Sequence, residues 1–245
     1  MNKFIKYFFR YPIEFILFID FFILFKILPL SFSRIIGSLI ATGIGPLLPV
    51  NNIAKKNLEV AFPQENKEWH NKVLKEIWHN FGCIIAEYAH LKEILDKRIT
   101  VIDNNYSKDF FDNKTQNIII SAHSSNWEIP GMSCRIKSDK ISAIVREPNN
   151  PLIRHFLISL RKKYSVNCFS KNMMGTKALI KNFQEGNSIA LLADQQLSSG
   201  VNVKFFNQDM NISALPAQMA LKSRCKIFLD WPVRKTNNDL EFEIH

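Results

Sequence analysis

The sequence predicts an α/β protein whose mainly parallel sheet is flanked by helices, with an N-terminal hydrophobic helix that attaches the chain to a membrane. From residue 117 onward, short apolar runs of β type alternate with segments of helical periodicity, a pattern typical of parallel sheets. The chain has 245 residues, 47% of them hydrophobic, which is enough for a sizeable core. An apolar run near the N-terminus, residues 13–30, has the length of a membrane span.

Two regions are expected along the chain. Residues 1–50 are predicted to form a hydrophobic membrane-attachment region, and residues 51–245 to form the α/β domain. Within that domain we expect a helical lead-in over 51–115 and the sheet core over 116–245.

The predicted free energy of inserting residues 13–30 into a membrane is between about zero and mildly favourable. Its 14 apolar residues supply about −6 kcal/mol, whereas Asp20 near the centre costs about +3 kcal/mol. A second apolar stretch, 35–50, suits a short re-entrant or interfacial segment. Basic residues before the first run favour a cytosolic N-terminus, and the four cysteines, without a Cys-x-x-Cys pair, are expected to be reduced. An interfacial helix or a two-segment hairpin satisfies both expectations; a buried core helix is the alternative.

The lead-in and the core differ in periodicity. Apolar residues recur at spacings of three and four over 64–98, which predicts one long helix or two. In the core, strands are expected at 117–122, 141–145, 166–169, 189–193 and 226–233, and helices at 151–164, 174–185 and 214–223.

Ionisable side chains follow three of the predicted strands. His123, Arg146 and Asp194 each come one residue past an apolar run. In open α/β sheets, ligands bind beyond the carboxyl ends of the strands, so we expect these side chains to converge on one crevice. The alternative is that each of them only marks the point at which the chain reaches the surface.

His123 and Glu128 are predicted to meet across a loop. On one helix, residues five apart would lie about 140° apart around the axis. Ser125 to Glu128 is also a capping-box pattern, but Pro130 would then remove a backbone bond of that helix. A loop over 123–129, with a helix starting near Pro130, fits better and leaves the carboxylate to orient the imidazole.

These residues resemble the lipid A biosynthesis acyltransferases of the lauroyl and myristoyl type, within the wider glycerolipid acyltransferases. The segment from His123 to Glu128 is similar to the family's pattern of His, four residues and an acid, and "REPNNPLI", "LLADQQ", "VNVKFF", "NLEVAFP" and "WHNFG" resemble further family segments. The likeness covers most of the chain. His-Ser-Ser replaces the more usual His-Phe-Gly, and Asn207 and Leu215 stand where glycines are expected. The chain stops at "EFEIH", in what reads as the next strand, so the resemblance predicts a shortened member.

The resemblance implies an O-acyltransferase that needs no metal and no other cofactor. The donor would be an acyl thioester on acyl carrier protein, and the acceptor a hydroxyl of an anionic, Kdo-bearing lipid A precursor at the cytoplasmic face of the inner membrane. His123 would act as general base and Glu128 would orient it. Arg146 would stabilise the oxyanion or hold a substrate phosphate. Asn126 would brace the turn, and Asp194 would hold Arg146 or a neighbouring loop.

The net charge and the motifs also indicate which partners and which alternative functions are compatible with the sequence. The formal net charge of +10 favours anionic partners, and the run from Arg161 to Lys163 would face anionic lipid or the carrier, or form a solvated helix end. Nucleic acid is not an expected partner, because no recognised binding motif is present. Three alternatives stay open: an acyltransferase with another acceptor such as a lysophospholipid, a serine hydrolase using Ser124 or Ser125, and an inactive membrane-attached binding protein. The hydrolase lacks a Gly-x-Ser-x-Gly elbow.

Overall fold

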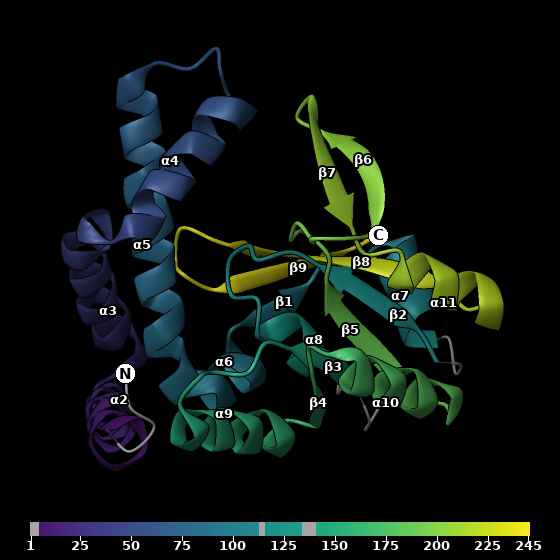
Figure 1. The fold of residues 1–245 in the computed structure, drawn as a ribbon, viewed down its shortest axis with the longest axis horizontal. Coiled ribbons are helices and arrows are strands. Elements are labelled where there is room, and N and C mark those ends of the chain that lie inside the picture. Colours follow the sequence, from purple (N-terminus) through teal and green to yellow (C-terminus); the bar gives the residue numbers. More distant parts are fainter. Residues whose placement is uncertain (1–4, 113–115, 134–140) are drawn as a thin grey trace. The chain divides into compact units, whose positions relative to one another are not determined.

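The computed structural model describes residues 5–112, 116–133 and 141–245 (Figure 1). The chain divides into two compact units. Unit 1 comprises Met1–Phe18, Glu93–Val203 and Met210–His245, and unit 2 comprises Ile19–Lys92 and Lys204–Asp209. The predicted boundary at residue 50 stays a prediction.

Unit 1 contains a seven-stranded sheet with the order β1-β9-β8-β2-β5-β3-β4. All neighbouring strands pair in parallel except β8 and β9. The mainly parallel sheet and the five predicted strands are therefore confirmed, whereas β1 lies inside the segment predicted to be helical. The strands are β1 Ile99–Val101, β2 Ile118–Ser121, β3 Ile141–Val145, β4 Val166–Ser170, β5 Ser188–Leu192, β8 Ile227–Arg234 and β9 Leu240–Ile244.

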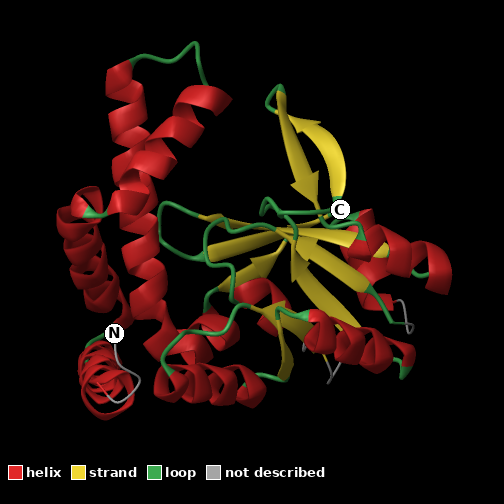
Figure 2. Cartoon of the chain, viewed as in Figure 1, coloured by secondary structure: helices red, strands yellow, loops and turns green. Residues whose placement is uncertain are grey.

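Helices flank this sheet and bury both of its faces (Figure 2). Successive residues of β2 serve opposite faces, because side chains alternate along a strand. Ile118 packs with Leu179 and Phe183 of α10, while Ile119 packs in a second cluster with Phe110 of α7. The helices of this unit are α7 Asn105–Asp112, α8 Ile129–Ser133, α9 Pro151–Lys163, α10 Met173–Gln184 and α11 Leu215–Ser223.

Asparagine caps fix where α9 and α10 begin. The side chain of Asn150 accepts a hydrogen bond from the Leu152 amide at 3.0 Å, and that of Asn172 accepts one from the Gly175 amide at 2.8 Å. Each cap satisfies a backbone donor that has no partner inside the helix. Gly186, just past the end of α10, takes the left-handed φ of 94° predicted for a glycine stop.

A separate two-stranded hairpin pairs β6, Val201–Phe205, with β7, Gln208–Ile212. Its two turn residues, Phe206 and Asn207, both have positive φ, 48° and 60°. Two consecutive left-handed residues are the mark of a type I′ turn, for which asparagine is well suited. Asn207 therefore takes the left-handed conformation at the position where a glycine is expected.

The long hydrophobic run at the N-terminus is broken into two helices. α2 spans Tyr11–Ile27 and contains residues 13–27 of the run expected over 13–30, while α3 spans Leu30–Ile44 and contains the first part of the second stretch, 35–50. Pro29 disfavours helical backbone at the residue before it and takes an extended ψ of 146° itself, which ends one helix and starts the next.

The remainder of the Ile19–Lys92 segment of unit 2 is also mainly helical. The predicted periodicity over 64–98 becomes two helices, α5 and α6, joined by a short 3₁₀ turn. Asn66 caps the start of α5 by accepting a hydrogen bond from the Trp69 amide at 2.8 Å. The bounds are α4 Pro49–Ala61, α5 Lys67–Glu87 and α6 Leu91–Lys97, the last of which crosses into unit 1.

Among the described residues, one helical stretch, Leu30–Leu47, has the length and apolar composition needed to cross a membrane. A third of it, 33%, is buried inside the protein. On the inner face of α3, Arg34 donates to the buried Glu87 of α5 at 2.6 Å. The opposite face exposes apolar side chains, including Phe32, Ile35 and Leu39. One face of α3 is therefore occupied by α5 and the other is open.

Two glycines permit the close crossing of α3 and α5. A Cβ atom added to Gly82 would overlap the carbonyl of Gly37, and one added to Gly37 would overlap the carbonyl of Gly82. Backbone cannot move aside as a flexible side chain does, so we expect Gly82→Ala to lower the free energy of unfolding by about 1–3 kcal/mol. Chemical denaturation of the two proteins measures this loss.

Gly43, also in α3, provides the matched control. A Cβ atom added there meets nothing within 4 Å. Gly43→Ala should stabilise the helix by about 0.5–1 kcal/mol, because alanine loses less backbone entropy than glycine. Equal effects of the two substitutions would contradict the close crossing.

Asp230 of β8 is a buried carboxyl, 3% exposed, whose Oδ1 has no hydrogen-bond partner among the described residues. Burial raises its pKa to about 7. The folded state then holds a proton that the unfolded state releases near pH 4, so this group's contribution to stability falls as pH rises from 4 to 7. We expect Asp230→Asn to gain stability relative to the wild type over this window, by at most about 4 kcal/mol. Urea unfolding at pH 4 and pH 8 tests this, and a constant difference would contradict it.

Candidate active site

The carboxyl ends of β2, β3 and β5 border one hollow of about 500 Å³. His123 follows β2, Arg146 follows β3 and Gln195 follows β5, and all three line this hollow. The first residues of α11 complete its wall on the other side. Adjacent parallel strands deliver their carboxyl ends to the same edge of a sheet, which brings these side chains together.

His123 is held on both sides of its imidazole ring. Nδ1 lies 2.8 Å from Oδ1 of Asp194, and the backbone amide of His123 donates to Oδ2 at 2.9 Å. An ionised carboxylate can only accept, so Nδ1 carries the proton and Nε2 keeps its lone pair. The side-chain amide of Gln195 donates to Nε2 at 3.3 Å. Asp194 thus holds the loop that carries His123 and does not hold Arg146.

The same contacts act on the Asp194 carboxyl. Burial tends to raise its pKa, but hydrogen bonds from the ring and the backbone of His123 outweigh burial and leave the pKa below its ordinary value. The stabilisation from these bonds is therefore present above the ordinary pKa of an aspartate and is lost as pH falls through the lowered value.

The loop after β2 turns sharply before α8. Ser125 has a left-handed φ of 47°, at the position where the resemblance leads one to expect glycine. Buried Asn126 braces the turn, because its side chain accepts a hydrogen bond from the Glu128 amide at 3.1 Å. The helix begins at Ile129, as the position of Pro130 predicts. The Ser124 hydroxyl points to the Pro232 carbonyl at 3.4 Å, which does not suit a hydrolase nucleophile.

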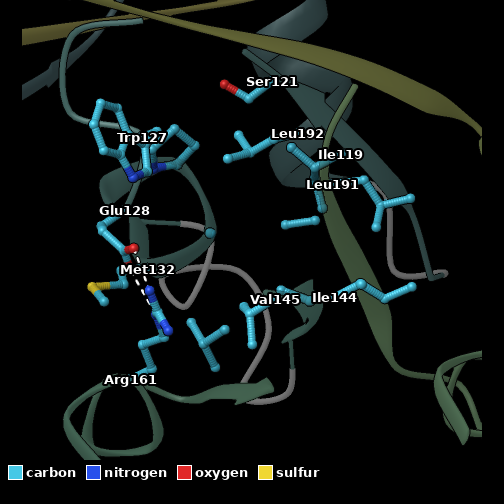
Figure 3. Close-up of a pocket in the computed structure, with 15 residues that line it drawn as sticks. Ile119, Ser121, Trp127, Glu128, Met132, Ile144, Val145, Arg161, Leu191 and Leu192 are labelled. Atoms are coloured by element: carbon cyan, nitrogen blue, oxygen red, sulfur yellow. Dashed lines mark hydrogen bonds and ion pairs between the residues drawn. The ribbon is translucent and has the colours of Figure 1, made fainter. Parts of the chain in front are cut away.

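The carboxylate of Glu128 is held by Arg161 of α9 (Figure 3). Arg161 donates from Nε to Oε2 at 2.8 Å and from Nη2 to Oε1 at 2.6 Å, and the two side chains are 13% and 9% exposed. This fork-to-fork geometry is the strongest pairing available to a carboxylate. The predicted contact between His123 and Glu128 is therefore not the arrangement observed: Glu128 reaches α9, and His123 bonds to Asp194.

A second, apolar cavity of about 80 Å³ lies beside the ion pair. It is bordered by Ile119 and Leu192 on the sheet and by Met132 on α8, as Figure 3 shows. Trp127, Glu128 and Arg161 line both this cavity and the hollow that holds His123. The polar hollow therefore adjoins an apolar recess, with the ion pair at their boundary.

Two cations stand at the rim of the hollow. Arg146 is exposed and forms no hydrogen bond or ion pair within the described part of the chain. Lys171 reaches Oε1 of Gln195 at 3.3 Å. The carboxylate of the neighbouring Glu147 accepts hydrogen bonds from Arg154, at 2.9 Å, and from Ser170, and not from Arg146. The rim is therefore positively charged and open to an anion.

Sequence reasoning did not identify the functional positions of Gln195 and Arg161. Gln195 follows Asp194 in the motif "LLADQQ". The motif points to this part of the chain, but it does not predict the hydrogen bond between Gln195 and His123. Arg161 was grouped with the basic run that follows it, but it alone of that run is withdrawn from solvent to meet Glu128.

Comparison with known proteins places these features in a family. A family model described as "Bacterial lipid A biosynthesis acyltransferase" matches residues 2–245. A search of curated proteins finds no match to the chain. The matched residues therefore include those that line the hollow, the pairs His123–Asp194 and Glu128–Arg161, and the N-terminal helices.

Proposed function

The chain belongs to the bacterial lipid A biosynthesis acyltransferase family, and we propose that it transfers a fatty acyl chain from acyl carrier protein to a hydroxyl of a Kdo-bearing lipid A precursor. The family match supports an acyltransferase of lipid A biosynthesis. The observation that carries the specific reaction is the His123 ring, whose Nδ1 is anchored to a carboxylate while Nε2 faces the hollow.

The proposed reaction needs few protein groups, because a thioester is already activated. Nε2 of His123 takes the proton from the acceptor hydroxyl as its oxygen attacks the thioester carbonyl carbon. The tetrahedral intermediate then collapses, the carbon–sulfur bond breaks, and the imidazolium returns the proton to the departing thiolate. General-base assistance of this kind contributes about 10²–10⁴-fold. The side-chain amide of Gln195 donates to Nε2 in this structure. In the proposed reaction the acceptor hydroxyl donates to Nε2 in its place.

Two carboxylates have distinct proposed roles. Asp194, bonded to Nδ1, orients the ring and stabilises its charged form during transfer. Glu128, expected from the sequence to do this, acts in this proposal through Arg161 by fixing the wall of the hollow. The apolar recess beside that wall receives the start of the acyl chain.

Arg146 is the proposed contact for a phosphate of the acceptor. Its exposed guanidinium at the rim matches phosphate geometry and has no competing partner among the described residues. We expect Arg146→Ala to raise the KM for the acceptor about tenfold or more with a smaller change in kcat. Steady-state kinetics with varied acceptor measures this, with Arg154→Ala, which removes a cation already paired with Glu147, as the control. A fall in kcat alone would instead assign Arg146 to the oxyanion.

We also propose that the chain is attached to the inner membrane with the active site facing the cytoplasm, and the N-terminal helices support the attachment. The outer face of α3 exposes apolar side chains, and the stretch Leu30–Leu47 meets the length and composition of a span. Because α5 covers the other face, we favour an interfacial position for α3.

A direct assay tests the proposed function. The full chain is incubated with lauroyl- or myristoyl-carrier protein and a Kdo-bearing precursor, and the acylated product is detected by mass spectrometry. A lysophospholipid serves as the second acceptor, and His123→Ala as the background. Product from the precursor supports the proposal, product from the lysophospholipid alone favours the other acceptor, and no product from either supports an inactive binding protein.

A further inference from the structure

We infer that the start of α10, with Met173, Met174, Lys171 and Lys177, is the docking surface for the acidic acyl carrier protein that delivers the thioester. This inference rests on the proposed function and adds to it the place where the donor protein binds. Lys171 and Thr176 line the hollow that contains His123, so these residues form its outer rim.

Positive charge is concentrated in the segment of the chain that carries this rim. Residues 146–184 contain eight basic residues and one acidic residue, a formal charge of +7, against +10 for the whole chain. Arg146, Lys171 and Lys177 are all exposed, and none of them forms an ion pair within the described residues. Some exposed lysines elsewhere have acidic partners, such as Lys204 with Asp209 and Lys226 with Asp109. The rim is therefore a surface whose charge the protein itself does not balance.

Two methionines lie within this basic surface. Met173 is 76% exposed and Met174 is 82% exposed, although they begin a helix that buries the large apolar side chains of Leu179 and Phe183 completely. Methionine is flexible and polarisable, which suits it to contact with a partner protein, and it is enriched in such interfaces. Exposed apolar side chains surrounded by unpaired cations match an acidic, amphipathic protein surface.

The position of the surface follows from the reaction. A carrier protein holds its thioester on a tethered arm, so it must bind at the edge of the hollow that the arm enters. The hollow lies at the carboxyl edge of the sheet, and Asn172 fixes the start of α10 at that edge through its hydrogen bond from the Gly175 amide. A partner seated on Met173 and Met174 would face the opening directly. An anionic membrane is the competing occupant, but membrane-interface belts favour tryptophan and tyrosine over methionine.

Binding of fluorescently labelled acyl carrier protein, measured by anisotropy, tests the inference. We expect Lys177→Glu to raise the Kd at least tenfold at low salt, and the double change Met173→Ser and Met174→Ser to raise it several-fold. All these side chains are exposed, so thermal unfolding should match the wild type. Lys222→Glu is the matched control, because it changes the charge equally at the far end of α11, about 10 Å along the helix from the rim.

The outcomes separate the docking surface from the reaction. With a carrier-free acyl-pantetheine donor, the turnover of Lys177→Glu should equal that of the wild type. Equal carrier affinity for Lys177→Glu and Lys222→Glu would overturn the docking surface while leaving the activity in place. Loss of binding to phosphatidylglycerol vesicles, with carrier affinity intact, would overturn it in favour of a membrane. A wild-type chain that binds carrier through these residues but transfers no acyl group would refute the proposed function and keep the docking surface.

Discussion

Replacement of His123 by alanine is expected to lower the turnover number for acyl transfer by about 10²–10⁴-fold, because it removes the only imidazole at the hollow among the described residues. In the proposed mechanism, the substitution takes away the group that accepts the hydroxyl proton and leaves the thioester and the acceptor to react unaided. Binding should change far less, since the ring contributes little apolar surface. Initial rates at saturating donor and acceptor measure the loss.

The fold should survive this change. The His123 side chain is about one-third exposed, 32%, and its partners lie in loops and not in the core. We expect an unfolding temperature within a few degrees of the wild type. His155→Ala, which removes an exposed histidine of α9, is the matched control and should keep full activity. Near-normal turnover by His123→Ala would exclude the ring as the base.

The second large effect is expected for Asp194→Asn. The amide has no negative charge to stabilise the imidazolium, and it can donate to Nδ1, which would favour the tautomer with the proton on Nε2. We expect kcat to fall by about 10²–10⁴-fold. Initial rates at saturating donor and acceptor measure this fall, and a turnover number close to that of the wild type would exclude Asp194 as the partner of the base.

Glu128→Gln separates the two carboxylates. It weakens the pairing with Arg161 and should lower thermal stability, with a much smaller loss of kcat than Asp194→Asn causes. The sequence-based pairing of His123 with Glu128 predicts the opposite: Glu128→Gln would lower kcat strongly and Asp194→Asn would not. The turnover numbers of the two variants therefore decide which carboxylate supports the base.

Much of the sheet follows from local pattern. Strands β2, β3, β4, β5 and β8 are apolar runs bounded by turns, and the buried core selects such residues directly. β1 has only three residues, Ile99–Val101, and forms because it pairs with β9, which is about 140 residues away in the sequence. No local periodicity describes such a strand. The predicted apolar run 13–30 differs from α2 chiefly at its end, because hydropathy sets the extent of a run whereas Pro29 ends the helix at Ile27.

The site was predicted less completely, for a physical reason. His123 and Asp194 are 71 residues apart, and they meet only because β2 and β5 are neighbours. The choice of Glu128 came from its nearness in sequence. Arg161, 33 residues further on, binds that carboxylate because α9 returns past the start of α8. The ends of the predicted strands thus indicate which residues lie at the carboxyl edge of the sheet. The order of the strands decides which of those residues are in contact.

The parallel register of β2 and β5 sets a limit on how this enzyme family can vary in length. Ser121 pairs with Leu192, and each strand places its functional residue, His123 or Asp194, two positions further on. An insertion or deletion of one residue between β2 and His123, or between β5 and Asp194, would turn one side chain to the opposite face of the sheet. The contact between His123 and Asp194 would then be lost. Homologues are therefore expected to keep this two-residue interval unchanged in both strands.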